Sequence, residues 1–86
     1  MKTITTVAAI AAFTFSSVIA AAPVNINTAS AEEIADALNG IGPSKARAIV
    51  EYREAYGEFS RADEIVFVRG IGTSTYETNK ADILVE

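Results

Sequence analysis

The 86-residue chain contains neither cysteine nor histidine. Without cysteine, no disulfide can stabilise the chain, even in a compartment where disulfides form. Cysteine and histidine are also the usual zinc ligands, and histidine is the commonest general base in enzymes. Their absence weakens the case for a metal centre and for an enzyme. It also means that stability must come from dense packing of apolar side chains.

Basic residues are scarce. Beyond Lys2 the chain has six lysines and arginines against eleven aspartates and glutamates, which is a formal charge of −5. A nucleic-acid-binding domain is normally basic, so this balance counts against DNA as a ligand. Because the local placement of cations decides what a phosphate meets, the total charge leaves the question open.

The N-terminal residues have the layout of a secretory signal peptide. A lysine follows the initiating methionine, residues 7–13 form an unbroken apolar run, and residues 20–22 are alanines suited to cleavage. Pro23 disfavours a cut directly before it, so we expect cleavage after Ala20 or Ala21. The alternative is an uncleaved membrane anchor. However, threonines and serines interrupt the segment, and the apolar run is shorter than the ~20 residues that a spanning helix needs.

We therefore expect residues 1–21 to be a signal peptide and residues 22–86 to form one domain. The mature protein is then expected to be secreted across the inner membrane and to be periplasmic. A domain of about 64 residues buries only about 60% of its unfolded surface, so its stability is marginal.

The stretch from Leu38 to Ala46 predicts two helices joined by a tight hairpin. Gly40 and Gly42 flank Ile41, and Pro43 suits the first position of a helix, where its missing N–H costs nothing. Backbone N–H groups then crowd at the start of the second helix, where unpaired amides and the helix dipole both favour an anion. The alternative is a tight turn that needs a positive φ and binds nothing.

Helices are expected on both sides of this hairpin, over residues 31–38 and 43–56. Ser30 and Glu33 fit a capping box at the start of the first helix. Gly57 ends the second helix, which is the longest expected element.

The second half of the chain predicts two more helices. Residues 60–63 look like a helix cap, so we expect the apolar run 65–68 to be helical although it is β-prone in isolation. Residues 73–75 are expected to cap a last helix that ends at about Ala81. The apolar residues of the C-terminal segment 82–86 should fold onto the core.

The two halves are related by a repeat of 30 residues. Gly70-Ile71-Gly72 repeats Gly40-Ile41-Gly42, and the caps and helix ends coincide without a gap. One such unit cannot bury its apolar stripe alone, whereas two units related by a pseudo-two-fold axis can. The repeat predicts a compact all-α domain of four to five helices.

Most of the conspicuous side chains are assigned to structure. We expect Ile41 and Ile71 to plug the hairpins into the core, and Phe59 to pack there as well. Arg53 is expected to pair with an acidic neighbour. Three tyrosines are expected at the edge of the core and not as base-stacking platforms: Tyr52, Tyr56 and Tyr76.

From residue 24 to residue 85 the chain resembles the helix-hairpin-helix domain of the ComEA family of competence proteins. The matching features are Val24–Ala29, Leu38–Ala46, Ile49–Arg53 with Gly57 and Phe59, and Gly70–Gly72. One Gly-Ile-Gly alone would be weak evidence, but two in register behind this lead-in are specific. The resemblance implies a tandem helix-hairpin-helix fold, an all-α, SAM-like bundle. A signal peptide directly before the domain resembles the short periplasmic form of the family.

The resemblance also implies a function. Such a protein is not an enzyme and needs no cofactor, metal or small-molecule substrate. It binds double-stranded DNA without sequence preference, through phosphates, and takes part in DNA uptake during natural transformation. Its partners would be duplex DNA and inner-membrane DNA-uptake channel proteins. The candidate DNA-binding residues are Gly40, Ile41, Gly42, Ser44, Lys45, Arg47, Gly70, Gly72, Thr73, Ser74 and Lys80.

The two hairpins are unequal in charge. Lys45 matches the lysine of the family pattern, and Arg47 lies in the same turn, where cations oppose the helix dipole. A ligand that supplies negative charge would explain them, whereas the alternative is that they are solvated surface charges. Glu77 is the repeat mate of Arg47, and Arg69 and Lys80 border the second hairpin. We therefore expect the first hairpin to contribute most of the binding.

Two other functions are considered. Glu51, Glu54 and Glu58 are spaced like a solvated helical face, with no base or nucleophile near them, so no acid–base pair is predicted. Repair glycosylases share the hairpin motif but need more chain to build a base pocket. The second hypothesis is a scaffold that does not bind DNA and docks a protein partner in the periplasm through its acidic surface.

Overall fold

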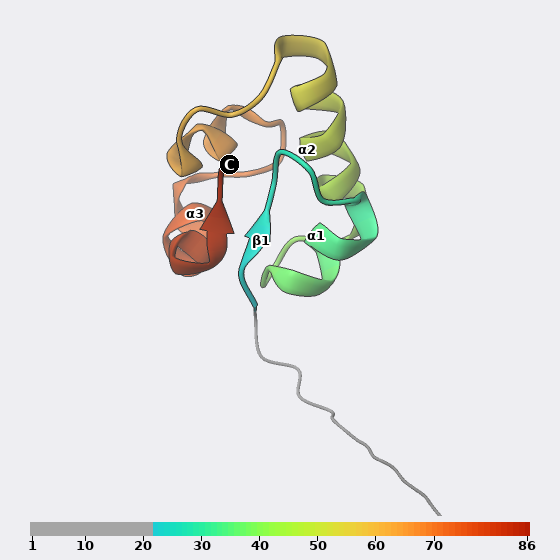
Figure 1. The fold of residues 1–86 in the computed structure, drawn as a ribbon. Coiled ribbons are helices and arrows are strands. Elements are labelled where there is room, and N and C mark those ends of the chain that lie inside the picture. The colour runs from blue at the N-terminus through green and yellow to red at the C-terminus, as the bar shows by residue number, and fades with distance from the viewer. Residues whose placement is uncertain (1–21) are drawn as a thin grey trace, which may run out of the picture.

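The computed structural model describes residues 22–86, and the expected signal peptide, residues 1–21, lies outside the described residues. The elements, in order, are β1 (Val24–Asn25), α1 (Ala31–Ala37), α2 (Pro43–Tyr56), the 3₁₀ helix η2 (Ala62–Phe67), α3 (Thr73–Asn79), the 3₁₀ helix η3 (Lys80–Asp82) and β2 (Ile83–Leu84). The fold is mostly helical, which confirms the predicted class. In Figure 1, α1 and α2 lie to the right of β1 and α3 lies to its left.

The first two helices begin where local chemistry predicts. The Ser30 Oγ accepts a hydrogen bond from the Glu33 N–H at 3.1 Å, and the Glu33 Oε1 accepts one from the Ser30 N–H at 2.9 Å. This is the predicted capping box, and the Ser30 cap contributes about 1 kcal/mol to the stability of α1. The following helix, α2, spans Pro43–Tyr56 as predicted and is followed by Gly57, whose φ is 95°.

Both glycine hairpins form as expected. Gly40 and Gly70 have φ values of 78° and 91°, in the left-handed region that favours glycine. Gly42 and Gly72 are extended and form the N-caps of α2 and α3. The prediction that residues 73–75 cap the last helix is wrong, because the N-cap is a glycine and no side chain caps that end.

The third helical segment differs from the prediction. It is a 3₁₀ helix that starts at Ala62, no side chain caps it, and the Ser60 N–H instead donates to Glu64 Oε1 at 2.9 Å. Side chains three residues apart share one side of a 3₁₀ helix. This geometry buries both Ile65 and Val68, and it leaves Phe67 65% exposed.

The C-terminal segment closes the fold against its beginning. β2 runs parallel to β1, with Val24 opposite Ile83 and Asn25 opposite Leu84. The expectation that this segment folds onto the core is confirmed for Ile83, which is 5% exposed. The strand pairing was not predicted, because two-residue strands carry no periodic signal.

One apolar core collects side chains from both halves of the repeat. Ile41 and Ile71 occupy equivalent places in it, with exposures of 2% and 4%, and Phe59 is 3% exposed. All three were predicted to be core residues. The complete buried apolar set is Val24, Ile26, Ala29, Ile34, Leu38, Ile41, Ala46, Ile49, Phe59, Ile65, Val68, Ile71 and Ile83.

Arg53 ties the N-terminal lead-in to α2. Its Nη1 donates hydrogen bonds to the carbonyl oxygens of Ile26 and Ala29, at 2.8 and 2.7 Å. The prediction of an acidic partner is therefore wrong. The turn after β1 presents two carbonyl oxygens to the guanidinium, and a charged donor satisfies both of them.

The aromatic residues of α2 divide into two environments. Tyr52 is half-buried and stacks on Phe59, with ring centroids 5.2 Å apart, as expected for a core edge. Tyr76, on α3, is also half-buried against the core. Tyr56 is 76% exposed, so its assignment to the core edge is wrong. It occupies the last helical turn, beyond the part of α2 that the core covers.

Candidate nucleic-acid interface

The first hairpin leads into an exposed helix N-terminus. Gly42 is the N-cap of α2, and its carbonyl oxygen accepts the first helical hydrogen bond from the Ala46 N–H at 2.9 Å. The preceding amides of the first turn, at Ser44 and Lys45, have no acceptor within the helix, and no side chain caps this end. Gly42, Pro43 and Ser44 are exposed. A helix start of this kind can bind an anion.

The second hairpin repeats this geometry. Gly72 is the N-cap of α3, its carbonyl oxygen accepts from the Tyr76 N–H at 3.1 Å, and again no side chain caps the helix. Thr73 and Ser74 are exposed, so their hydroxyl groups accompany the amides. Neither α2 nor α3 has an acidic residue in its first turn, so no carboxylate of that turn competes with an incoming anion.

Lys45 joins the two hairpins. A Cβ atom built on Gly70 would lie 3.6 Å from the Lys45 Cγ and 3.7 Å from its Cε. The aliphatic stem of Lys45, which belongs to the first hairpin's helix, thus packs along the backbone of the second hairpin.

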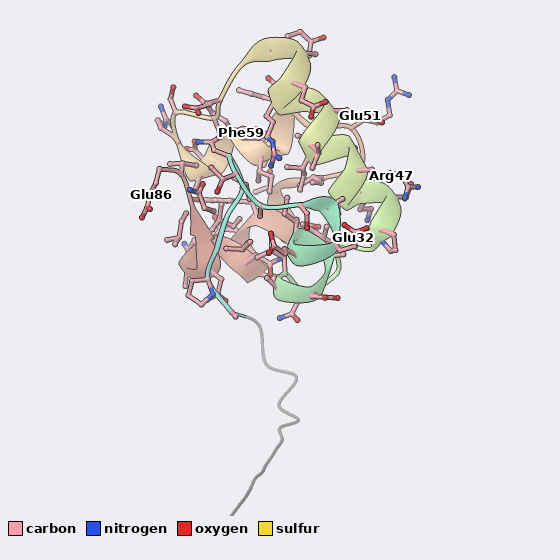
Figure 2. All side chains as sticks on the ribbon, turned by 45° about the vertical axis from the view of Figure 1, so that its right-hand side comes forward. Glu32, Arg47, Glu51, Phe59 and Glu86 are labelled. Carbon is pink, nitrogen blue, oxygen red and sulfur yellow. The ribbon has the colours of Figure 1, made fainter. Side chains whose placement is uncertain are left out.

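Arg47 lies on a different side of α2 from Lys45. Residues two apart on a helix do not face each other. Arg47 lines a shallow pocket with Pro43 and with Glu32 and Asp36 of α1. Figure 2 shows its side chain pointing away from the body of the molecule. The structure therefore does not bring Arg47 beside Lys45 between the hairpins.

Lys80 lies at the far end of α3 from Gly72. Its ammonium forms an ion pair with Glu77 at 2.9 Å, and this hydrogen bond raises the pKa of Lys80. The Glu77 carboxylate is engaged in the same ion pair. Arg69, by contrast, is exposed immediately before Gly70. Arg69 was not among the candidate DNA-binding residues, although its position next to Gly70 in the sequence could have indicated it.

Ile41 contributes to the site only through its backbone, since its side chain is buried in the core. The site therefore consists of two uncapped, glycine-led helix starts, with Lys45 between them and Arg69 at the edge. The helix-hairpin-helix motif family matches residues 20–84, which include all of these positions. The chain belongs to the helix-hairpin-helix family.

The helix-hairpin-helix domain is shared with several relatives. It is 52% identical over 60 residues to an uncharacterized protein of Haemophilus influenzae and 48% identical over 63 residues to ComE operon protein 1 of Bacillus subtilis. It is also 43% identical over 61 residues to endonuclease/exonuclease/phosphatase family domain-containing protein 1 of Homo sapiens. The matches cover 70%, 73% and 71% of this chain.

The matches cover 54%, 30% and 10% of the three relatives. The chain therefore spans about half or less of the curated relatives that it matches. The resemblance to the ComEA family is confirmed. For the human relative, the similarity is confined to a tenth of that protein's length.

The role of Asn79 in the helix-hairpin-helix domain was not predicted from the sequence. Asn79 is 1% exposed, and its side chain bonds to the backbone of Asn39, the residue before Gly40. Its repeat mate is Ile49, which is fully buried. A polar residue in an apolar register of the repeat was the signal that would have identified it.

Three carboxylates of α2 and the loop after it lie at the surface. Glu51, Glu54 and Glu58 are all exposed, and no histidine or cysteine accompanies them. Within residues 22–86 no cluster of three side chains has the composition of a metal site. No helix in the same range has the length and apolar character needed to cross a membrane.

Proposed function

We propose that the protein binds double-stranded DNA through the phosphates, using both hairpins and without reading the base sequence. The observation that carries this proposal is the paired helix N-termini at Gly42 and Gly72, with Lys45 lying across Gly70 between them. Backbone amides and hydroxyl groups contact phosphates irrespective of sequence. Two such sites, with Lys45 of the first helix start against Gly70 of the second hairpin, could hold two points of a duplex backbone.

The distribution of the six cations supports this proposal despite the charge of −5. Three cations are engaged elsewhere in the described part of the chain: Arg53 with two carbonyl groups, Arg61 with Asp63, and Lys80 with Glu77. The other three, Lys45, Arg47 and Arg69, have no ion pair between residues 22 and 86. Lys45 and Arg69 lie at the second hairpin, whereas Arg47 lies on another side of α2. Two of the three unpaired cations of residues 22–86 therefore lie at the proposed site.

The proposal includes a biological setting. The signal-peptide pattern of residues 1–21 and the similarity to a ComE operon protein support a periplasmic role in DNA uptake during natural transformation. The protein would act by binding and not by catalysis, and it would deliver DNA to channel proteins of the inner membrane. The lack of a histidine or cysteine nucleophile supports the non-enzymatic role.

A titration of labelled duplex with the mature protein across salt concentrations tests the proposal. With about four phosphate contacts, the slope of log K against log salt should be about −3 to −4. Duplexes of unrelated sequence should give the same curve. The proposal fails if fluorescence anisotropy at low salt shows no duplex binding at protein concentrations of about tens of micromolar, because non-specific binding has a Kd of about 10⁻⁴ to 10⁻⁶ M at physiological salt and tightens steeply as the salt is lowered.

A second candidate function is the docking of a protein partner. Tyr56 and Phe67 are 76% and 65% exposed, and both line an open groove that also includes Glu51 and Arg69. Exposed aromatic residues are typical anchors of protein interfaces. Capture of a stoichiometric periplasmic protein, lost on changing Tyr56→Ser and Phe67→Ser, together with DNA titrations that show no binding, would favour this function.

A further inference from the structure

Asn79 is the one buried polar side chain among residues 22–86, with an exposure of 1%. Its Oδ1 accepts a hydrogen bond from the Asn39 N–H at 2.7 Å. Its Nδ2 donates to the carbonyl oxygens of Asn39 and Thr75, at 2.8 and 2.9 Å. Both donors and the acceptor of the side-chain amide are thus satisfied, and the partners fix which atom is nitrogen and which is oxygen.

These bonds connect the two halves of the repeat. Asn79 is the last residue of α3, the helix that follows the second hairpin, and Asn39 lies immediately before Gly40 in the first hairpin. The side chain of Asn79 bonds to both the N–H and the carbonyl oxygen of Asn39. The first hairpin is therefore attached at its first residue to the helix of the second.

Packing alone does not require an asparagine at this position. Its repeat mate Ile49 shows that an apolar side chain fills the equivalent place in the other half, at 0% exposure. A buried amide loses its hydration and stabilises the fold only if its hydrogen bonds are made. What Asn79 provides and an isoleucine cannot is a directional attachment to the backbone of the first hairpin.

We propose that Asn79 is a positioning residue that fixes the separation of the two hairpins and so makes the protein prefer duplex to single-stranded DNA. This inference rests on the proposed function. The phosphates of a duplex stand at fixed separations, so two sites held at a matching distance bind it without further ordering. A single strand adapts to any separation and gains little from a fixed one.

Three variants separate positioning from packing. Asn79→Leu keeps the shape of the side chain and removes all three bonds. Asn79→Asp keeps the shape but, when ionised, cannot donate to the carbonyl oxygens. Asn39→Ala is the matched control, because Asn39 takes part through its main chain and its own side chain is in none of the three bonds.

The readout is the ratio of duplex affinity to single-strand affinity, measured by anisotropy with the mature protein at one salt concentration and at a temperature where circular dichroism shows folded protein. We expect Asn79→Leu to lower duplex affinity about tenfold, as expected for buried groups left unpaired, with little change for the single strand. Asn39→Ala should leave the ratio within about twofold of the wild type, because it keeps all three bonds.

If Asn79→Leu does not fold, Asn79→Asp provides the test. A protonated carboxyl group can accept from the Asn39 N–H and donate to the Asn39 carbonyl, so it restores the pair. The duplex-to-single-strand ratio of Asn79→Asp should therefore rise towards the wild-type ratio as the pH is lowered. The wild-type ratio, measured in parallel, removes the contribution of the other carboxylates.

The outcomes are distinct. A wild-type protein that binds no duplex refutes the proposed function itself. A wild-type protein that prefers duplex, with the preference unchanged in Asn79→Leu or with an Asn79→Asp ratio that does not respond to pH, refutes only the positioning role. Equal affinity of the wild type for both forms of DNA refutes it as well.

Discussion

The aliphatic stem of Lys45 lies against the backbone of Gly70, with its Cγ 3.6 Å from where a Cβ on that glycine would be. The residue therefore contacts both hairpins: its backbone lies in the first turn of α2, after the first hairpin, and its side chain lies against the second. Packing of the stem leaves the ammonium as the polar end of a partly buried side chain. We expect a cation held in this way to contact a phosphate bound between the hairpins.

Lys45→Glu should weaken binding to every duplex sequence alike. The variant removes one phosphate contact and adds a repulsive charge, so we expect a loss of about tenfold at low salt and a salt slope smaller in magnitude by about one. Salt titrations of two unrelated duplexes measure both effects. A loss confined to one sequence would contradict phosphate recognition.

Lys80→Glu is the matched control and a prediction of its own. It changes the net charge by the same amount as Lys45→Glu, but it lies at the far end of α3, where the native ammonium pairs with Glu77. We expect duplex affinity to fall less than about twofold, because Lys80 lies away from the hairpins and its charge is already paired with that of Glu77. An equal loss in both variants would mean that total charge, and not the position of Lys45, determines binding.

The two glycines of the second hairpin should respond differently to alanine. Gly70 has a φ of 91°, so Gly70→Ala is strained and should lower stability by about 1–2 kcal/mol. Gly72 is extended, with nothing within 4 Å of an added Cβ, so Gly72→Ala should fold normally. Its methyl group would still stand at the amides that are proposed to hold phosphate.

Thermal unfolding and duplex titration together test this pair. A loss of about 1 kcal/mol corresponds to a fall in Tm of about 4–8 °C for a domain of this size. We expect that fall for Gly70→Ala only, and weaker duplex binding at unchanged Tm for Gly72→Ala. Unchanged duplex binding in Gly72→Ala would show that the second hairpin is not part of the DNA interface.

Much of the fold was predictable because its signals are local. The capping box of Ser30 and Glu33, Pro43 at the first position of α2, and the glycines of the two hairpins each act within a few residues. These features predicted the two hairpins and the bounds of α2, and they predicted the end of α1 to within one residue.

The rest depends on contacts between distant parts of the chain. The pairing of β1 with β2, the bonds of Arg53 to the lead-in and the attachment of Asn79 to Asn39 all join residues far apart in sequence. The periodicity of apolar residues in the sequence does not predict such contacts. The direction of a cation is similarly invisible in sequence, so Lys45 and Arg47 looked like one cluster although they face different ways.

Arg53 is expected to stabilise the fold and not to bind DNA. Its Nη1 satisfies the carbonyl oxygens of Ile26 and Ala29, so Arg53→Met, which keeps an apolar stem, leaves both without that donor. We expect a loss of about 2 kcal/mol in the free energy of unfolding, as for hydrogen bonds to charged groups. Urea unfolding measures this loss.

The folded Arg53→Met variant should bind duplex with nearly unchanged affinity and salt slope, because the guanidinium of Arg53 is engaged with the backbone. A smaller salt slope with unchanged stability would instead place Arg53 on the DNA.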